Sequence, residues 1–202
     1  MMKGDFIFDI REIRRRAREH VERGAVTENY RGDLERIVTL LNEALATELV
    51  CVLRYKMHAL VARGIHAEPV VREFRQHATD EQGHADLIAE RITQLGGKPN
   101  FNPEGLATRS HSEYAEAESL VDMIREDIVA ERIAIDTYAE IILFIGDKDP
   151  TTRRLLEGIL SKEEEHADDL ARVLTWLRPT KEEDEHLPPS PGNGGTSPSM
   201  PS

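Results

Sequence analysis

Apolar residues recur roughly every three to four positions along four long stretches of the chain, which is the spacing of an amphipathic helix. The first stretch follows Asp33, a residue type that favours a helix N-terminus, and ends before Gly64. The second begins near Pro69, because proline is tolerated in a first helical turn, and ends before Gly96. The sequence therefore predicts four core helices, over residues 33–63, 68–95, 112–145 and 150–177.

The connections between these helices differ in length. Residues 146–150, Gly-Asp-Lys-Asp-Pro, predict a tight turn, whereas residues 96–111 are rich in Gly and Pro near their start and show no periodic pattern. Antiparallel neighbours need only a few connecting residues, so the longer segment indicates a crossover along the length of a bundle. We expect an all-α fold, an antiparallel four-helix bundle with a long crossover between its second and third helices.

Both ends of the chain lie outside this pattern. Residues 1–32 form an N-terminal arm, in which the Arg- and Glu-rich stretch 10–23 predicts a short, solvated surface helix. Residues 179–202 are rich in Pro, Gly and Ser and lack the apolar residues needed for a core, so we expect a disordered tail. The bundle domain is predicted to span residues 33–178.

Composition narrows the class of protein. The chain is 39% apolar but only 5% aromatic, which suits packed helices, and its formal net charge of −12 argues against nucleic-acid binding. No stretch approaches the roughly 20 apolar residues that span a bilayer, and the N-terminus lacks a signal-peptide pattern. The single Cys51 excludes an internal disulfide and is expected in the core. We expect a cytoplasmic protein.

Glutamate and histidine residues interrupt the apolar stripes of the predicted helices. Glu81 and His84 stand three positions apart, on one face of the second helix, and Glu163 and His166 repeat this spacing on the fourth. The spacing alone is a weak signal, since the polar tail also contains one such pair. However, an ionised carboxylate in a helix seam is costly unless it is paired or metal-bound. These side chains therefore indicate a cation site.

The two halves of the chain repeat one another. In each half, a Glu on the first helix precedes the Glu-x-x-His pair by 32 or 33 residues, and a Tyr follows that Glu by seven; these residues are Glu48 and Tyr55, then Glu131 and Tyr138. Such a duplication predicts one site with four carboxylates and two imidazoles, the ligand set of di-iron and di-manganese bundles. A metal-free Glu–His network is the alternative. Zinc is less suited, because its closed sites prefer four ligands with Cys or His.

These motifs resemble the bacterioferritin branch of the ferritin-like superfamily, over roughly residues 33–178. Tyr55 matches the Tyr beside that family's metal centre, and residues 90–100 resemble the end of its second helix. The resemblance implies two iron ions bridged by Glu81 and Glu163. It implies further that each metal has a terminal carboxylate and a capping imidazole, which would be Glu48, Glu131, His84 and His166.

Some features of the family are missing. Bacterioferritins bind haem through a Met directly after the bridging Glu of the second helix, where this chain has Gln82, so haem is not expected. A Pro/Gly/Ser-rich tail replaces their fifth helix, which leaves the size of a cage open. Dps proteins, the starvation-induced cages, build their sites between subunits. Here all six ligand-type residues are present within one chain, which favours a bacterioferritin-type centre. The thiol-bearing Dps-like proteins carry paired cysteines, and this chain has only Cys51.

The resemblance implies a ferroxidase that oxidises Fe(II) to Fe(III) with O₂ or H₂O₂, for iron storage or detoxification, in a homo-oligomer. Glu81 and Glu163 would hold the metals at the spacing of a two-electron step, and Tyr55 is either a transient electron donor or a core aromatic. Two alternatives use the same bundle. One is peroxide scavenging, as in rubrerythrins or manganese catalases, with manganese as the alternative metal, and the other is a metal-binding assembly subunit without turnover.

The other histidines are less informative. His77 lies four residues before Glu81 on the same side of its helix, so it is either an auxiliary metal ligand or a partly buried, hydrogen-bonded side chain. We favour the second interpretation, a partly buried and hydrogen-bonded side chain. The remaining isolated histidines receive no role and are expected at the surface or at helix ends; they are His20, His58, His66 and His111.

Overall fold

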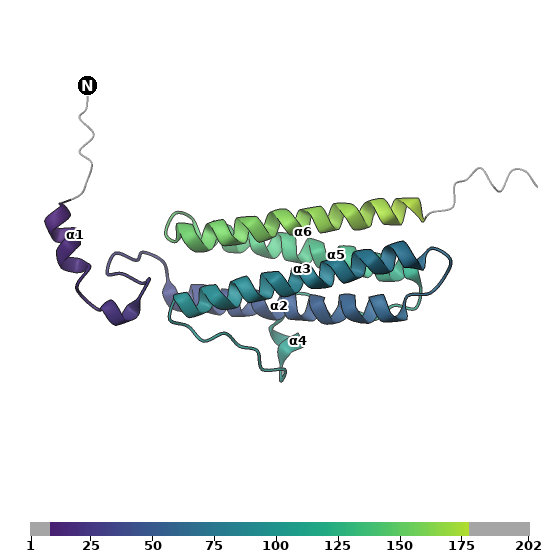
Figure 1. The fold of residues 1–202 in the computed structure, drawn as a ribbon, viewed down its shortest axis with the longest axis horizontal. Coiled ribbons are helices and arrows are strands. Elements are labelled where there is room, and N and C mark those ends of the chain that lie inside the picture. The colour runs from purple at the N-terminus through teal and green to yellow at the C-terminus, as the bar shows by residue number, and fades with distance from the viewer. Residues whose placement is uncertain (1–8, 178–202) are drawn as a thin grey trace, which may run out of the picture.

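A computed structural model describes residues 9–177 of the chain, and every regular element in that range is a helix (Figure 1). Two helical hairpins pack against each other so that neighbouring helices run antiparallel. The predicted antiparallel four-helix bundle is therefore confirmed. Its long helices are α2 (Leu34–Val61), α3 (Ala67–Gln94), α5 (Leu120–Ile145) and α6 (Pro150–Trp176).

Side chains at the N-caps fix where three of these helices start. Asp33, Ser119 and Asp149 each accept a hydrogen bond from the backbone N–H of the third residue of α2, α5 and α6, respectively. This bond satisfies a backbone donor that has no partner within the helix. In the turn before α3, Gly64 has a φ of 116°, a conformation that side chains disfavour.

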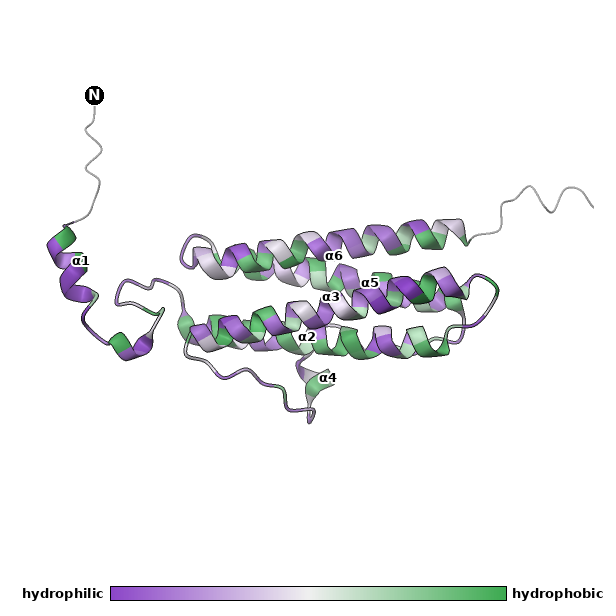
Figure 2. Cartoon of the chain, in the orientation of Figure 1, coloured by the Kyte–Doolittle hydropathy of each residue, from purple (hydrophilic) through white to green (hydrophobic). Residues whose placement is uncertain are grey.

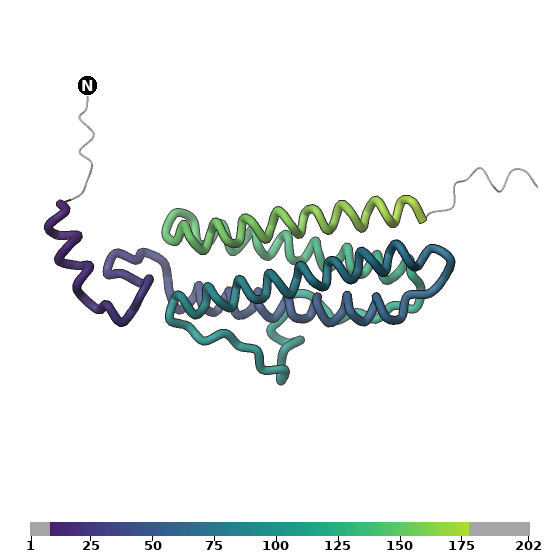
Figure 3. The backbone as a smooth tube through the Cα atoms, in the orientation of Figure 1, coloured from purple at the N-terminus to yellow at the C-terminus, as the bar shows by residue number. Residues whose placement is uncertain are grey.

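The connection between α3 and α5 runs along the outside of α2 and includes the short helix α4 (Leu106–Arg109) (Figure 3). The predicted crossover is thus present, but the prediction that the third core helix begins near Ser112 was wrong. The helix α5 begins at Leu120, after its cap Ser119. The residues that we assigned to its first two turns instead continue the crossover.

Polar side chains on α2 hold the crossover in this extended path. Asn42 Oδ1 accepts a hydrogen bond from the backbone N–H of residue 100 at 2.8 Å, and Thr47 Oγ1 accepts one from residue 111 at 3.0 Å. The buried Arg54 donates to the carbonyl oxygen of Glu113 at 2.8 Å. Two of these bonds, at residues 111 and 113, hold the chain in the crossover at the point where the third core helix was expected to start.

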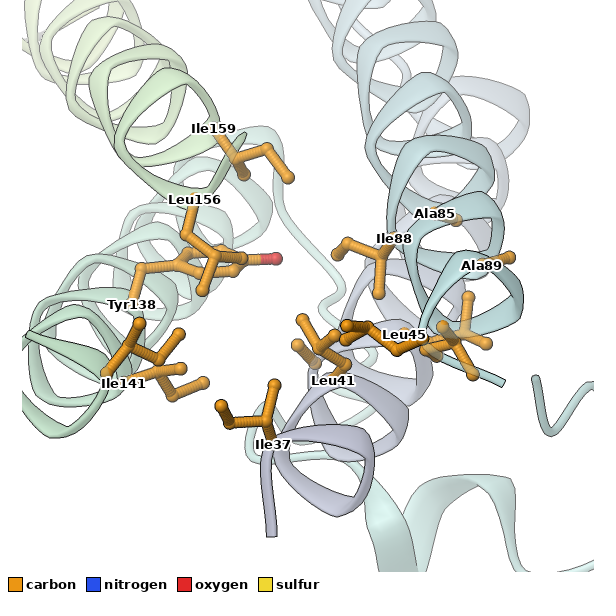
Figure 4. Close-up of a cluster of buried hydrophobic side chains, with 14 of the residues drawn as sticks. Ile37, Leu41, Leu45, Ala85, Ile88, Ala89, Tyr138, Ile141, Leu156 and Ile159 are labelled. Atoms are coloured by element: carbon orange, nitrogen blue, oxygen red, sulfur yellow. The ribbon is translucent and has the colours of Figure 1, made fainter. Parts of the chain in front are cut away.

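The hydrophobic core consists of two clusters, one toward each end of the bundle. The cluster nearer the start of α2 includes Leu41, Leu45 and Tyr138, and Figure 4 shows the phenol oxygen of Tyr138 pointing away from α5 into the space between the hairpins. The other cluster includes Tyr55 and Phe74, together with Cys51, which is buried as expected. Hydrophilic residues occur on every long helix (Figure 2), and some of them are buried in the layer between these clusters.

The N-terminal arm is helical over a shorter stretch than predicted. Helix α1 (Ile10–Arg16) ends well before Arg23, and a separate 3₁₀ turn, η1 (Val21–Arg23), follows it. Between them, His20 has a positive φ of 52°, which takes the backbone out of the right-handed helical region directly before η1. The predicted disordered tail lies outside the described residues. None of the helices in residues 9–177 has an apolar run that could span a bilayer.

A buried cluster around Asp149 ties the arm and the α5–α6 turn to α3. Asp149 is 2% exposed, accepts hydrogen bonds from Tyr30 at 2.8 Å and Thr152 at 3.0 Å, and pairs with Arg91 at 3.0 Å. Burial alone would raise the pKa of Asp149, but the hydrogen bonds from Thr152 and Tyr30 and the charge of Arg91 lower it below its usual value. Its ionised form therefore stabilises the folded chain.

We expect Asp149→Ala to destabilise the protein by about 3 kcal/mol, because it removes a helix cap and leaves the buried Arg91 without its counter-ion. Thermal melting should fall by roughly 6–12 °C. The control is Asp147→Ala, since the Asp147 side chain is fully exposed and, among residues 9–177, pairs only with Arg153 at the surface. Equal melting temperatures for the two variants would contradict this role of Asp149.

The stabilisation by Asp149 should also depend on pH. The pKa of its carboxyl lies below the usual 3.8 in the folded chain, so its contribution is present above that pH and is lost as pH falls through the folded value. Urea unfolding of the wild type and Asp149→Ala should show a difference at pH 7 that narrows as the pH falls below 3.8. A constant difference would show that the charge of Asp149 is not what stabilises the turn.

Candidate metal centre

The six residues that the sequence singled out lie together between the two hydrophobic clusters. Each long helix contributes: α2 and α5 one Glu each, and α3 and α6 one Glu and one His each. All four carboxylates are 1% exposed, and the imidazoles are nearly as buried. The i, i+3 spacing places both members of each pair on the inner face of their helix. The residues are Glu48, Glu81, His84, Glu131, Glu163 and His166.

One group of side chains surrounds His84. Its Nδ1 atom lies 2.9 Å from Glu163 Oε1, 3.1 Å from Glu81 Oε2 and 3.4 Å from Glu48 Oε2. Potential ligand atoms of these four residues all lie within 4.8 Å of one another. Carboxylate oxygens and an imidazole nitrogen at this separation can all reach one metal ion.

A second group surrounds His166. Its Nδ1 atom lies 3.2 Å from Glu81 Oε1, 3.8 Å from Glu163 Oε2 and 3.9 Å from Glu131 Oε1. These four residues again offer ligand atoms within 4.8 Å of one another. Glu81 and Glu163 belong to both groups. In each case, one carboxylate oxygen faces one imidazole and the other oxygen faces the second imidazole.

A tyrosine from the opposite hairpin holds each unshared carboxylate. Tyr55 on α2 donates a hydrogen bond to Glu131 on α5, and Tyr138 on α5 donates one to Glu48 on α2. Burial raises the pKa of both phenols well above the usual value, and the facing carboxylates raise it further. Both tyrosines therefore keep their protons at neutral pH and act as donors. Tyr138 was noted in the sequence only as part of the repeat.

The acidic side chains respond differently to being buried together. Burial raises the pKa of Glu81 well above its usual value, and the charges of Glu163 and Glu48 raise it further. Burial and the same kind of repulsion also raise the pKa of Glu131. For Glu163 burial acts in the same direction, but interactions with His166 and His84 reverse it and lower the pKa. The repulsion among the carboxylates is therefore only partly relieved by the imidazoles.

The surrounding carboxylates favour the protonated form of both imidazoles. Burial alone would lower the pKa of His84, but interactions with Glu163, Glu48 and Glu81 raise it to about 12. Burial opposes protonation of His166 as well, and Glu163 and Glu131 overcome it and raise the pKa. A metal ion that binds here would displace these protons, because an imidazole coordinates metal in its neutral form.

The donors fit a pair of metal ions. Four buried atoms of the group make no hydrogen bond among the described residues, although they lie at ion-pair distances: Glu48 Oε2, Glu81 Oε1, Glu163 Oε1 and His166 Nδ1. Each belongs to a residue of one or both four-residue groups, and a buried polar atom without a hydrogen bond carries a desolvation cost. Cations between the carboxylates would satisfy these atoms and cancel the repulsion. Oxygen-rich sites with imidazole suit iron and manganese.

A surface hollow of about 390 Å³ lies beside His84. Three aliphatic side chains, Leu87, Leu155 and Ile159, line it together with His84, Gly158 and two basic side chains, Arg154 and Lys162. His84 is 8% exposed, which makes it the most exposed of the six residues. Solvent therefore comes closest to the group at this imidazole.

The structure corrects one assignment among the other histidines. We expected His58 at the surface or at a helix end, but it is fully buried, and its Nδ1 lies 2.9 Å from Asp127 Oδ2. Arg54, which is 2% exposed, also pairs with Asp127 at 3.1 Å. A signal was present, since Asp127 lies four residues before Glu131 and His58 three after Tyr55, on the same helical faces.

Two further residues lie where their sequence positions suggested. His77 is buried and hydrogen-bonded, with its Nδ1 3.3 Å from the hydroxyl of Tyr55 and its ring stacked 4.0 Å from that of His166. Burial and the neighbouring His166 lower the pKa of His77 to about 3, so its ring is neutral. Gln82 is partly exposed and donates to Asp86 at 3.0 Å.

Comparisons with known proteins agree with this architecture. Residues 38–178 match the model of the ferritin-like domain. The chain is 30% identical to a bacterioferritin of Mycobacterium avium over 147 residues, which cover 72% of this chain and 87% of that protein.

Solved structures give the same result. A bacterioferritin-related protein of Bacteroides fragilis, described as a dodecameric thioferritin, superposes with a TM-score of 0.72 at 33% identity, over 78% of this chain and 94% of that chain. A ferritin-like diiron-carboxylate protein of Bacillus anthracis gives a TM-score of 0.63 at 28% identity, over 70% of this chain and 97% of that chain. Together with the bundle and its buried carboxylates, these matches show that the chain belongs to the ferritin-like superfamily.

Proposed function

We propose that this protein is a ferroxidase, which binds two Fe(II) ions within a single chain and oxidises them to Fe(III). The observation that carries the proposal is the pair of four-ligand groups that share Glu81 and Glu163. Shared carboxylates hold two metal ions at a fixed and short separation, which is what a two-electron oxidation requires. The diiron-carboxylate description of the Bacillus anthracis relative supports iron as the metal.

The six side chains have different roles in this proposal. Glu81 and Glu163 bridge the two ions, Glu48 and His84 complete one site, and Glu131 and His166 complete the other. Carboxylate oxygens are hard ligands that favour Fe(III) over Fe(II), so they promote the loss of an electron from each ion. Tyr55 and Tyr138 are positioning residues, because their hydrogen bonds orient the terminal carboxylates.

The reaction balances with either oxidant. Two Fe(II) ions give up two electrons, which with two protons reduce O₂ to H₂O₂ or reduce H₂O₂ to two molecules of water. The charged imidazoles release protons when metal binds. The Fe(III) product then passes to storage or leaves the centre for another cycle, which makes the activity one of iron storage and detoxification.

The same proposal includes assembly with further copies of the chain. The Bacteroides fragilis relative is described as dodecameric. On and beside α2, apolar side chains remain exposed in the single chain, among them Leu53 at 50%, Leu60 at 70% and Ile65 at 93%. Apolar surface of this kind is typical of an interface between subunits.

Glu81→Gln and Glu163→Gln should each slow rapid Fe(II) oxidation at least about 100-fold, because losing a bridge changes the separation of the two ions. The control is Glu164→Gln, which neutralises the exposed neighbour of Glu163 on α6. Stopped-flow mixing of the Fe(II)-loaded protein with oxygen measures the effect. Oxidation at the wild-type rate in either bridge variant would contradict the proposed role.

The metal-free forms of these two variants should differ in stability. Glu81 has a raised pKa, so its removal relieves repulsion, and the melting temperature of Glu81→Gln should equal or exceed that of the wild type. Glu163 has a lowered pKa because it pairs with both imidazoles, so Glu163→Gln should melt several degrees lower. Calorimetry of the chelator-treated proteins measures the two melting temperatures. A lower melting temperature for Glu81→Gln than for Glu163→Gln would show that Glu81, and not Glu163, is the carboxylate that the imidazoles stabilise.

Tyr55→Phe and Tyr138→Phe should each weaken the binding of one of the two metal ions by about 10–100-fold, the usual effect of removing a partner that orients a ligand. Titration with Mn(II) followed by electron paramagnetic resonance measures the affinity. The same method separates the second role considered for Tyr55, since a tyrosyl radical formed during oxidation would disappear in Tyr55→Phe and persist in Tyr138→Phe. Unchanged affinities in both variants would exclude a positioning role.

A further inference from the structure

A third group of potential ligands lies next to the two-metal groups, on the side of Tyr55. Glu73 and His77 on α3 and Asp169 on α6 offer ligand atoms within 4.8 Å of one another. The spacings continue those of the centre, since His77 precedes Glu81 by four residues and Asp169 follows His166 by three. His77 is 2% exposed, whereas the two carboxylates are partly exposed. The group therefore extends from the surface to the edge of the buried centre.

The hydrogen bonds of Tyr55 determine which nitrogen of His77 is free. Tyr55 has a single proton, which it donates to Glu131, so its oxygen can only accept from His77. His77 Nδ1 must therefore carry the proton of the neutral ring, and Nε2 keeps its lone pair. Metal-binding histidines typically donate their other ring N–H in this way. The ring is thus already in the tautomer that a metal ion needs.

The carboxylates of the group remain free to bind a cation. Among residues 9–177, Glu73 has no ion-pair partner. Asp169 pairs with Arg172, but this pair is at the surface, where such contacts contribute little, and it uses one of the two carboxylate oxygens. One imidazole nitrogen and two carboxylates form a mixed ligand set that suits borderline divalent ions such as Fe(II), Mn(II) or Co(II).

The internal repeat provides a comparison within the same chain. A shift of 82 residues relates Glu81 to Glu163 and His84 to His166, and the same shift relates Glu73 to Leu155, His77 to Ile159 and Asp169 to Leu87. These three aliphatic residues line the hollow beside His84. All three positions therefore hold ligand-type side chains on one side of the centre and aliphatic side chains on the other.

We propose that Glu73, His77 and Asp169 form a third divalent-cation site between α3 and α6, on the path by which metal ions reach the buried pair. The proposal goes beyond the ferroxidase function, because it concerns binding of a cation and not its oxidation. Binding here removes part of the hydration shell of the ion at the surface. The His77 ring, stacked on His166, then separates the outer ion from the ligands of the centre by the thickness of one side chain.

Co(II) is a suitable probe, because it binds the same ligand types and is not oxidised by air at such sites. We expect calorimetric titration of the full-length protein to give three Co(II) per chain. The double variant Glu73→Gln/Asp169→Asn should bind two, with the third lost or weakened at least about tenfold. Asp168→Asn is the matched control, since Asp168 is the exposed neighbour of Asp169 and also pairs with Arg172. It should still bind three.

The outcomes separate this site from the centre. Glu81→Gln/Glu163→Gln should lose the inner ions and keep the outer one, which anomalous diffraction from cobalt-soaked crystals would place at His77. Two ions per wild-type chain, or three in the Glu73→Gln/Asp169→Asn variant, would overturn the third site. If the wild-type chain binds one ion, and only the Glu73→Gln/Asp169→Asn variant loses it, the result would support the third site and contradict the ferroxidase centre.

The path to the centre has its own kinetic test. With Fe(II) added after oxygen, the Glu73→Gln/Asp169→Asn variant should oxidise iron several-fold more slowly than the wild type. With Fe(II) loaded anaerobically to equilibrium before oxygen is added, the two proteins should react at similar rates. If the variant and the wild type react at similar rates in both orders of addition, ions reach the centre by another route.

Discussion

The repulsion among four buried carboxylates is the constraint on which the rest of this structure depends. A bundle of this size could fill its middle layer with Leu and Ile, as it does on both sides of the centre. Instead, Glu81 and Glu131 are buried where their ionised forms are disfavoured, and the two imidazoles relieve only part of the cost. A site that remains unfavourable without a cation binds one more strongly, because cation binding removes the repulsion.

The scaffold around the centre keeps it from relaxing. Packing within each hairpin is more extensive than packing between hairpins, so the two halves could separate and hydrate the carboxylates. The hydrogen bonds of Tyr55 and Tyr138 cross this boundary in both directions and orient the terminal carboxylates of the opposite hairpin. The Asp149 cluster and the anchors of the crossover act at the periphery. They fix the turn before α6 and the segment before α5, and so the register of the two helices that bring Glu131 and Glu163 inward.

The sequence was sufficient for the bundle and for the juxtaposition of the six ligand-type residues, because both follow from helical periodicity. Glu48 and Glu131 stand in apolar stripes, and the repeat relates the two halves without knowledge of their packing. Other features depend on partners distant in sequence. The path of the crossover at residues 111 and 113 depends on hydrogen bonds from α2, and the buried His58 pairs with Asp127 on another helix. The local sequence pattern shows which residues can make such contacts, but it does not show which of them contact each other in the fold.

The internal duplication also explains why the two sides of the centre need not do the same work. A duplicated hairpin begins with equal residues at related positions, and the ligands of the centre still obey that symmetry. Outside the ligands it is broken: Tyr55 has the neutral His77 beside it, whereas the related position next to Tyr138 is Ile159, part of the hydrophobic cluster. Polar ligand atoms lower the cost of moving a hydrated cation inward, and an aliphatic lining does not. The arrangement therefore favours the α3–α6 surface near Asp169 over the hollow beside His84, which Arg154 and Lys162 also line, as the approach for a cation.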